Sequence, residues 1–501
     1  MATQVARFPV QRFKGYLNMK TTTNTLKFRP SFLLVLLISL FLFFFSGCLQ
    51  TGTIENSAGK TLWHKGSNQT ARLSVFLNLK KPFGPGINMD ITSIDIHSNG
   101  VWRPLTSGTV EIDAVKIGMG QVFVAGHDVP AGRYDKVKFT LGTAAIHKSD
   151  KKAPLKPDNP EIEVALPAEL TVSKGDSRSL FVTWDTEASL TDEGGLAPTF
   201  SIAEQIIPLV ADLAFAACPR INTLYLIRTD KNQVCGSIGV GGHPSYLAVN
   251  PSNTYLYVLA AGDSAIKVIE LSTHRTVDII KLPTTLKPTF MTVSSDARSA
   301  YLLDERGNRL VLLDLPSGTI SNNVMLGHRP QYALCLPDHN QLAVSSSMSQ
   351  SVYLVDPVKL TTEKIISVGS DPQGLLVWND LLYITESRLN SVTVYDLKEH
   401  QILKRIRVGS TPRRLFNTGS TIFVANHKSG NLSTLVPGQL TAFRTIKTGS
   451  KPFEMTYSEN QRWLYIGDEG RGEITVIDNT SKRVDRRIML GTPPLGLAVL
   501  R

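Results

Sequence analysis

The sequence GSTPRRLFNTGSTIFVANHKSGNLSTL, residues 409–435, contains the unit that decides the fold. It opens with a Gly-x-x-Pro turn, continues into a short apolar stretch, and then enters a second stretch, IFVAN, that carries an aromatic residue. Short apolar runs bounded by turn residues are typical of β-strands, and the 3.6-residue period of a helix is absent. The unit therefore predicts consecutive β-strands.

The same turn recurs along the second half of the chain. Its prolines are spaced 40 to 44 residues apart, and one copy, TLKP, has Thr285 in place of the glycine. A repeat of this length is typical of a four-stranded propeller blade. The turn prolines are Pro244, Pro288, Pro330, Pro372, Pro412, Pro452 and Pro494.

The two ends of the repeat region complete each other. Residues 494–500, PLGLAVL, supply only the first strand of a blade, and the three remaining strands are found before the first complete repeat, as LAFAA, TLYLI and VCGSI. A blade assembled from both ends leaves no free sheet edge at the joint. We therefore predict an all-β chain with a seven-bladed β-propeller over residues 206–501, whose last blade is closed by both ends.

Acidic residues end the third strand of most repeats. In that position they are expected to accept backbone N–H groups of the turn that follows. They are Glu270, Asp314, Asp356, Asp396 and Asp478.

These repeats resemble the YVTN family of bacterial and archaeal β-propellers. The resemblance covers roughly residues 211–501 and is carried by the Gly-x-x-Pro turns and by YVAN-like strands such as Phe423-Val424-Ala425-Asn426. It implies the propeller fold. Propellers of this kind occur in surface-layer proteins, in periplasmic binding proteins and beside lactonases and lyases, so the resemblance implies no particular reaction.

A short apolar run near the N-terminus predicts export. Residues 32–45 are mostly aliphatic or phenylalanine, follow three basic residues and precede Ser46-Gly47-Cys48. The run is short for a bilayer span, and this order of segments is typical of a secretory signal. FSGC also resembles a lipobox, which makes Cys48 the predicted lipidation site.

This interpretation divides the N-terminal region into a lipoprotein signal peptide, residues 1–47, and a tether, residues 48–66. Met19 is an alternative start, and a plain anchor helix or an unlipidated signal stays open. We expect an exported protein that is lipid-anchored to the cell envelope, at the outer membrane in a Gram-negative host, because Leu49 rather than aspartate follows the cysteine.

Between the tether and the propeller, residues 67–205 predict a β-sandwich. Alternating stretches such as LSVFLNL, ITSIDIH and SLFVTWD are separated by turn clusters. The segments VPAGRYDKVKFTLG and TSIDIHSNGVWRPL resemble an uncharacterised family of bacterial exported β-sandwich domains. That resemblance implies a topology like that of carbohydrate-binding domains and no particular ligand.

Charge and cysteines limit the partners. The net charge is +11, but residues 1–47 contain six basic and no acidic residues, so the chain without them carries +5 and no nucleic-acid module is recognised. Cys335 is expected to be a buried thiol. Cys218 and Cys235 are expected on neighbouring strands of the closing blade, where a disulfide and two free thiols both stay open.

Motifs for catalysis are absent from the sequence. It contains no HExxH, GxSxG, P-loop, helix-opening GxGxxG or cysteine–histidine cluster with zinc spacing. We therefore expect no catalytic residue, no metal site and no cofactor.

The mouth of the central channel is the candidate binding site. Residues before and just after the turn prolines are expected to surround it, and they combine cations with aromatic rings that would attract an anionic or sugar-like ligand. The alternative is a solvated rim with aromatics packed between blades. The candidates are His243, Lys287, Arg329, Arg413, Arg414, Lys451, Tyr246 and Tyr332.

Three classes of function follow from the sequence. The first is a non-enzymatic, membrane-tethered platform for binding or adhesion at the cell envelope, with a polysaccharide or an envelope protein as partner. The second is a lactonase- or lyase-like enzyme, which would require carboxylates and a histidine that converge on the channel mouth. The third is a purely structural envelope component.

Overall fold

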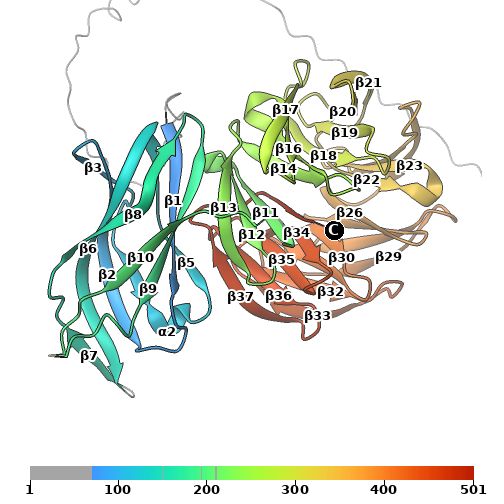
Figure 1. Cartoon of the computed structure of the whole chain (residues 1–501). Helices are drawn as coiled ribbons and strands as arrows, with labels where there is room; N and C mark the ends of the chain where they lie inside the picture. Colours follow the sequence, from blue (N-terminus) through green and yellow to red (C-terminus); the bar gives the residue numbers. More distant parts are fainter. Residues whose placement is uncertain (1–69, 149–150, 193, 209–210, 501) are drawn as a thin grey trace, which may run out of the picture. The chain divides into compact units, whose positions relative to one another are not determined.

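β-Strands make up nearly all of the regular structure. The computed structural model describes residues 70–148, 151–192, 194–208 and 211–500 (Figure 1). The predicted signal peptide, Cys48 and the tether lie outside these residues. No helix in the described ranges is long and apolar enough to cross a membrane. The few helices are α2 (Ala114–Ile117), η1 (Pro219–Ile221), η2 (Ala261–Asp263) and η3 (Pro337–His339).

The N-terminal part consists of two sheets. The first has the order β10-β9-β1-β5, and the second has the order β3-β2-β6-β7, with β4 beside β2 and β8 beside β6. The strands are β1 (Thr70–Leu79), β2 (Ile87–Ser98), β3 (Val101–Pro104), β4 (Val110–Asp113), β5 (Gln121–Pro130), β6 (Gly132–Lys148), β7 (Lys151–Leu155), β8 (Glu161–Val172), β9 (Ser177–Asp185) and β10 (Thr199–Glu204).

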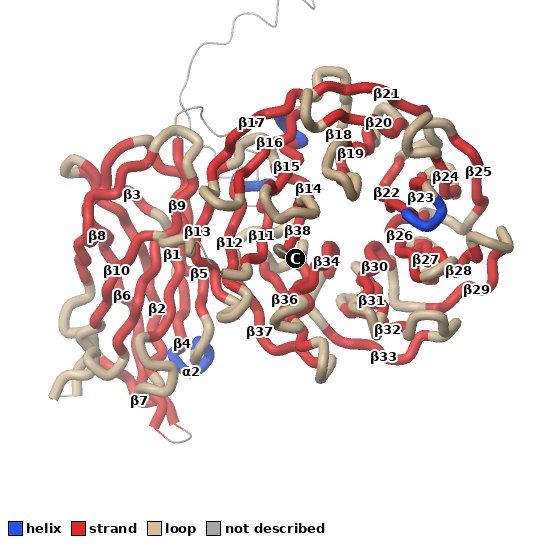
Figure 2. The backbone as a smooth tube through the Cα atoms, turned by 45° about the vertical axis from the view of Figure 1, so that its right-hand side comes forward, coloured by secondary structure: helices blue, strands red, loops and turns tan. Residues whose placement is uncertain are grey.

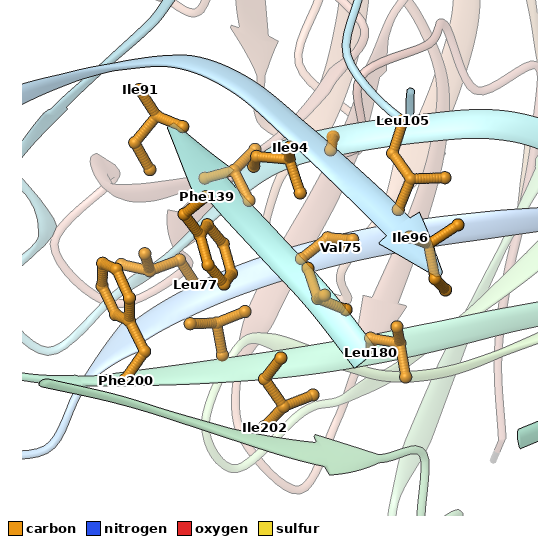
Figure 3. Close-up of a cluster of buried hydrophobic side chains, with 14 of the residues drawn as sticks. Val75, Leu77, Ile91, Ile94, Ile96, Leu105, Phe139, Leu180, Phe200 and Ile202 are labelled. Carbon is orange, nitrogen blue, oxygen red and sulfur yellow. The ribbon is translucent and has the colours of Figure 1, made fainter. Parts of the chain in front are cut away.

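A single apolar core lies between these two sheets. Val75 of β1 and Leu180 of β9 come from one sheet, and Ile94 of β2 and Phe139 of β6 come from the other, all of them fully buried (Figure 3). The burial follows the two-residue period of a strand, which places alternate side chains on the core face. The predicted β-sandwich architecture is therefore present. Trp184 belongs to its core and donates its indole N–H to Ser189 Oγ at 3.1 Å.

Seven four-stranded antiparallel sheets follow in residues 213–499 and are arranged in a ring (Figure 2). From the inner to the outer strand, six of them are β14 (Pro244–Val249), β15 (Tyr255–Ala260), β16 (Ala265–Glu270), β17 (Arg275–Lys281); β18 (Pro288–Val293), β19 (Ser299–Asp304), β20 (Arg309–Asp314), β21 (Thr319–Met325); β22 (Pro330–Leu336), β23 (Gln341–Ser346), β24 (Ser351–Val355), β25 (Thr362–Ser367); β26 (Pro372–Trp378), β27 (Leu381–Glu386), β28 (Ser391–Asp396), β29 (Gln401–Arg407); β30 (Pro412–Asn417), β31 (Ile422–Asn426), β32 (Asn431–Leu435), β33 (Ala442–Lys447); β34 (Pro452–Ser458), β35 (Trp463–Asp468), β36 (Glu473–Asp478) and β37 (Arg483–Met489).

The seventh sheet is assembled from both ends of the region. Its inner strand is β38 (Gly496–Val499), and its other strands are β11 (Leu213–Cys218), β12 (Thr223–Arg228) and β13 (Gln233–Gly239). β38 pairs antiparallel with β11, with Gly496 opposite Ala217 and Val499 opposite Ala214. It also contacts the inner strands β34 and β14 on either side. The composite sheet predicted from the sequence is thus present, and it joins the last repeat to the first.

The two cysteines of this sheet do not lie on neighbouring strands, which corrects the expectation from the sequence. Cys218 ends β11 and Cys235 lies on β13, with β12 between them, and both thiols are free. The Cys235 thiol donates to the carbonyl of Leu226 on β12 at 3.5 Å. Burial raises the pKa of both thiols, that of Cys235 to about 11, so both are protonated and unreactive at neutral pH.

The described residues of the sandwich and the propeller belong to one compact unit, in which the sandwich and the closing sheet share a buried boundary. The ring of Phe76 meets that of Tyr225 edge-on at 5.6 Å. Around this apolar contact, the hydroxyls of Ser74 and Tyr225 are 2.8 Å apart and those of Ser179 and Ser237 are 3.0 Å apart. Because these polar groups are buried and satisfied, the sandwich packs on the propeller as part of one folded unit.

Candidate functional site

Hydrogen bonds between neighbouring blades hold three of the Gly-x-x-Pro turns in place. Residues before the proline take a left-handed backbone conformation in four turns, with φ of 55–62°. In three of these turns, an asparagine of the preceding blade accepts the N–H of that residue. Asn222 bonds His243 at 2.9 Å, Asn308 bonds Arg329 at 3.1 Å, and Asn390 bonds Thr411 at 2.9 Å. These bonds fix the mouth of the ring.

Two other turns are held by an aspartate of their own blade. Asp304 accepts the N–H of Lys287 at 2.9 Å, and Asp468 accepts that of Lys451 at 3.1 Å. Burial raises the pKa of Asp304, but three backbone N–H groups and the Arg309 guanidinium outweigh this and keep the pKa below its usual value. The carboxylate is therefore charged and structural.

A β-bulge follows the turn proline in six of the inner strands. The pairing register shifts there in β14, β18, β22, β26, β30 and β34. An extra residue in one strand bends it and redirects the side chains beside it. The second residue after each proline consequently has a particular place in every blade. These residues are Tyr246, Phe290, Tyr332, Gly374, Arg414, Glu454 and Gly496.

Three of these side chains form an aromatic arc. Phe290 lies between Tyr246 and Tyr332, with ring centroids 4.3 and 4.4 Å apart. Burial raises the pKa of both tyrosines, that of Tyr332 to about 12, so the phenols stay neutral. Phe290 is buried between the two tyrosines, which are themselves half-buried, so the three rings mainly pack against one another.

A buried ion pair continues the series beyond Gly374. Arg414 Nε lies 3.2 Å from Glu454 Oε2, and each residue is only 7% exposed. The guanidinium also lies over the rings of Tyr332 at 4.9 Å and Phe453 at 4.7 Å. A Cβ on Gly374 would approach the carbonyl oxygen of Arg413 to 2.5 Å, so glycine allows the backbone of β30 to lie close to β26.

These contacts change the interpretation of two sequence candidates. Arg414 is neither exposed nor free to attract a ligand, because Glu454 neutralises it and two rings cover it. Tyr332 is occupied by Phe290 and by the same arginine. The structure therefore places both residues in the packed centre of the ring, as the inter-blade packing alternative expected, rather than on an open funnel.

Of the remaining candidates, Tyr246 belongs to the aromatic arc, and the others lie on the rim and are only partly available. Glu305 accepts both Lys287 at 2.6 Å and Arg329 at 3.0 Å, which offsets part of the predicted positive field. Lys451 is exposed, and the half-buried Arg413 lies 6.0 Å from the Phe453 ring. The eight predicted residues thus do not converge on one pocket.

A polar pocket lies instead between the β26–β29 and β30–β33 sheets. Its volume is about 280 Å³. Two turns and two loops after the second strands supply its lining, which sequence reasoning had not assembled. The lining residues are Asp371, Ser387, Arg388, Asn390, Ser410, Thr411 and Lys428.

Hydrogen bonds between the two sheets hold this pocket in shape. The Ser387 hydroxyl donates to the carbonyl of Pro412 at 2.5 Å, and Asn390 Oδ1 accepts the N–H of Thr411 at 2.9 Å. Asp371 Oδ1 accepts Gln373 Nε2 at 2.7 Å. These bonds leave the Asn390 amide N–H₂ and the second oxygen of Asp371 available as donor and acceptor.

The charge of the pocket is positive. Arg388 and Lys428 are both exposed, and neither forms a salt bridge within the described part of the chain. Asp371 is the single carboxylate of the lining. Two cations, one carboxylate, an amide and three hydroxyls can together bind a molecule that carries both an anionic group and hydroxyls.

In the described ranges, no three His, Cys, Asp or Glu side chains are grouped closely enough to hold a metal ion. The lactonase- or lyase-like alternative requires carboxylates and a histidine that converge on the channel mouth, where Asp371, Glu454 and His243 are the candidates. Glu454 is paired with Arg414, Asp371 lines the pocket, and His243 belongs to another blade.

Comparison with known proteins supports the fold. A family model described as a YNCE-like beta-propeller matches residues 281–498, whereas no curated protein matches the sequence. A functionally unknown protein from Desulfotomaculum acetoxidans DSM 771 is 12% identical with a TM-score of 0.52, over 58% of this chain and 99% of that one. A candidate 6-phosphogluconolactonase from Bacteroides fragilis NCTC 9343 is 12% identical with a TM-score of 0.50. The match covers 59% of this chain and 100% of that one.

At these identities the two structures show a shared fold and carry no activity across. The resemblance to YVTN-type propellers is confirmed for the repeat region, whereas the lipoprotein signal and the family of the sandwich stay predictions. Residues 281–498 are similar to the YNCE-like beta-propeller family, and the whole repeat region shares the propeller fold.

Proposed function

We propose that this protein is a binding protein of the cell envelope whose propeller holds an anionic carbohydrate in the pocket between β26–β29 and β30–β33. The observation that carries the proposal is the pair of unpaired cations, Arg388 and Lys428, beside an acceptor and an amide. The cations suit a carboxylate or phosphate, and Asp371 and Asn390 suit vicinal hydroxyls.

The site is open and polar, which limits its affinity. Exposed cations act through water and are screened by salt, so binding should weaken as ionic strength rises. An open site also suits the end or a side group of a polysaccharide at a surface. This agrees with the predicted role as a binding or adhesion platform.

The membrane tether predicted at Cys48 would place this platform at the envelope. Cys48→Ser should remove acylation and release the protein into the soluble fraction, as cell fractionation and mass spectrometry of the N-terminus would show. Retention of the variant in the membrane would contradict the lipid anchor. A lactonase- or lyase-like activity stays the alternative, supported by fold similarity alone.

The pocket is tested by calorimetric titration with D-glucuronate, with D-glucose as the neutral probe. Arg388→Gln/Lys428→Gln should lower the affinity for glucuronate at least about tenfold, since hydrogen bonds to charged groups contribute about 1.5–3 kcal/mol each. Both side chains are exposed, so the melting temperature should hardly change.

The matched control is Arg329→Gln/Lys451→Gln, which removes one arginine and one lysine from turns of other blades. It should retain glucuronate binding. Loss of binding in the control but not in the pocket variant would place the binding site at the rim cations Arg329 and Lys451 instead of in the pocket. No binding of glucuronate to the unaltered protein, or equal binding of glucose, would contradict the proposal.

A further inference from the structure

Each outer strand of the propeller carries a bulge at the same place. In β29 the pairing register shifts between Val394 and Tyr395 of the neighbouring strand, and in β33 it shifts between Thr434 and Leu435. Bulges turn a side chain out of the regular pleat. The residues at the bulges are Cys235, Val277, Ser321, Glu363, Leu403, Phe443 and Asp485.

β29 and β33 use these positions in the same way. Their bulge residues are apolar and exposed, Leu403 at 39% and Phe443 at 81%. β17 also exposes an apolar bulge residue, Val277 at 53%, but there Asp278 follows it. In β29 and β33 a cation follows the bulge residue, and a second cation ends each strand. The equivalent cations are Lys404 and Arg444, and Arg407 and Lys447, all of them exposed. We call these six residues of β29 and β33 the basic edge.

The charge of the basic edge is one-sided. β29 contains Lys404, Arg405 and Arg407, and β33 contains Arg444 and Lys447, without an acidic residue in either strand. Arg405 pairs with Glu386, whereas the four cations of the basic edge form no salt bridge in the described structure. By contrast, β21 has no charged residue, and β25 has one of each sign.

Protection of a sheet edge is the simplest reason for cations on an outer strand, because they discourage pairing with another chain. That reason does not account for the difference between strands. β21 is equally an outer strand and lacks cations, and it keeps Ser321 at its bulge. It also does not account for Phe443, since an exposed aromatic ring on an edge favours association.

We propose that the basic edge docks on a membrane surface that contains anionic lipids. Cations next to exposed apolar side chains are the combination that interfacial binding requires, because the cations meet phosphate groups while the apolar groups enter the headgroup region. β29 and β33 are outer strands of successive blades (Figures 1 and 2), so both can meet one surface. The inference concerns different residues from the pocket and does not rest on sugar binding.

An anionic polysaccharide could also meet the cations, but Leu403 and Phe443 favour the membrane. A sugar ring can cover one face of Phe443, but it leaves the rest of that side chain, which is 81% exposed, and Leu403 in water. A lipid surface removes the ring from water, which stabilises the bound state.

The test uses the full chain mixed with vesicles of phosphatidylcholine alone or with phosphatidylglycerol, each containing brominated phosphatidylcholine. Phe443→Trp places a fluorophore at the bulge of β33, and Val277→Trp places one at the equivalent bulge of β17. Subtracting the emission of the unaltered protein isolates the added tryptophan. Bromine quenches only at short range, so this readout reports docking whether or not the chain is also lipid-anchored.

We expect quenching for Phe443→Trp on vesicles with phosphatidylglycerol and little on phosphatidylcholine alone, and none for Val277→Trp on either. Adding Lys404→Glu/Arg444→Glu/Lys447→Glu should weaken docking by about a hundredfold or more, since each cation near an anionic surface contributes roughly fivefold. Arg275→Glu/Lys281→Glu/Lys364→Glu, with the same change of charge on β17 and β25, should leave the quenching intact.

Equal quenching at both bulges, or none at residue 443, would overturn the proposal. So would quenching that survives charge reversal of the basic edge. A change of emission with dextran sulfate in solution, without quenching on anionic vesicles, would assign the edge to a soluble polyanion and equally overturn membrane docking.

Discussion

The two halves of the ring use the same backbone position for opposite purposes. In the sheets β14–β25, the second residue after the turn proline is Tyr246, Phe290 or Tyr332, and the three rings pack together. In the sheets β26–β37, the same position holds Gly374, Arg414 or Glu454. The aromatic half is committed to packing, whereas the polar half also carries the pocket and the basic edge. Function is therefore best sought in the polar half.

Removing β38, the strand that joins the two halves, should cause the largest loss of stability. Deleting residues 494–501 removes β38, which lies between β34 of the polar half and β14 of the aromatic half. The loss should approach the whole stability of the propeller, about 5–15 kcal/mol, because both halves then expose apolar edges. Calorimetry of the truncated chain is the measurement. A melting temperature equal to that of the full chain would show that the halves do not depend on β38.

Breaking the buried ion pair between Arg414 and Glu454 should cause the second-largest loss of stability. Glu454→Ala leaves the Arg414 charge buried without a partner, which should cost about 3–5 kcal/mol in urea unfolding. Arg414→Met/Glu454→Leu removes both charges and should recover most of that loss. If the single and double variants are equally unstable, packing rather than charge holds the polar half, and the contrast with the aromatic half is wrong.

The smallest change in stability is expected for a substitution in the aromatic arc. Burial raises the pKa of Tyr332 to about 12, above the usual value near 10, so the neutral phenol stabilises the fold. That contribution is complete below pH 10 and is lost as the pH rises to about 12. Tyr332→Phe should therefore lose stability less steeply than the unaltered protein over that range, and should match it closely at pH 7. Parallel pH profiles of unfolding would show that Tyr332 is solvated.

Much of the propeller could be predicted from the repeat. The spacing of the prolines gave the sheets, and the segments at the two ends gave the composite sheet with β38 beside β11. Turn chemistry was also predictable. Asp356 accepts two backbone N–H groups at 2.8 Å, as its position after the third strand indicated. Glu270 differs, since it accepts the Thr273 hydroxyl at 2.8 Å.

The site was harder to predict, because it depends on where side chains point. A repeat shows that Arg414 follows a turn, but not that a bulge lies beside it and that its side chain packs inward onto Tyr332. The separation of Cys218 and Cys235 by β12, by contrast, could have been read from the order of the segments LAFAA, TLYLI and VCGSI. One feature of the sequence does indicate the pocket. Arg388 and Lys428 each lie sixteen residues after a turn proline, so the repeat aligns these cations on adjacent blades.

The most direct measurement is electron density from crystals soaked with D-glucuronate. We predict density for the ligand between Arg388 and Lys428, with its carboxylate toward these cations and its hydroxyls toward Asp371 and Asn390. The packed centre around Tyr332 should be unchanged. Density at the centre of the ring or at the rim cations, with the pocket left empty, would contradict the claim that the polar half binds the ligand.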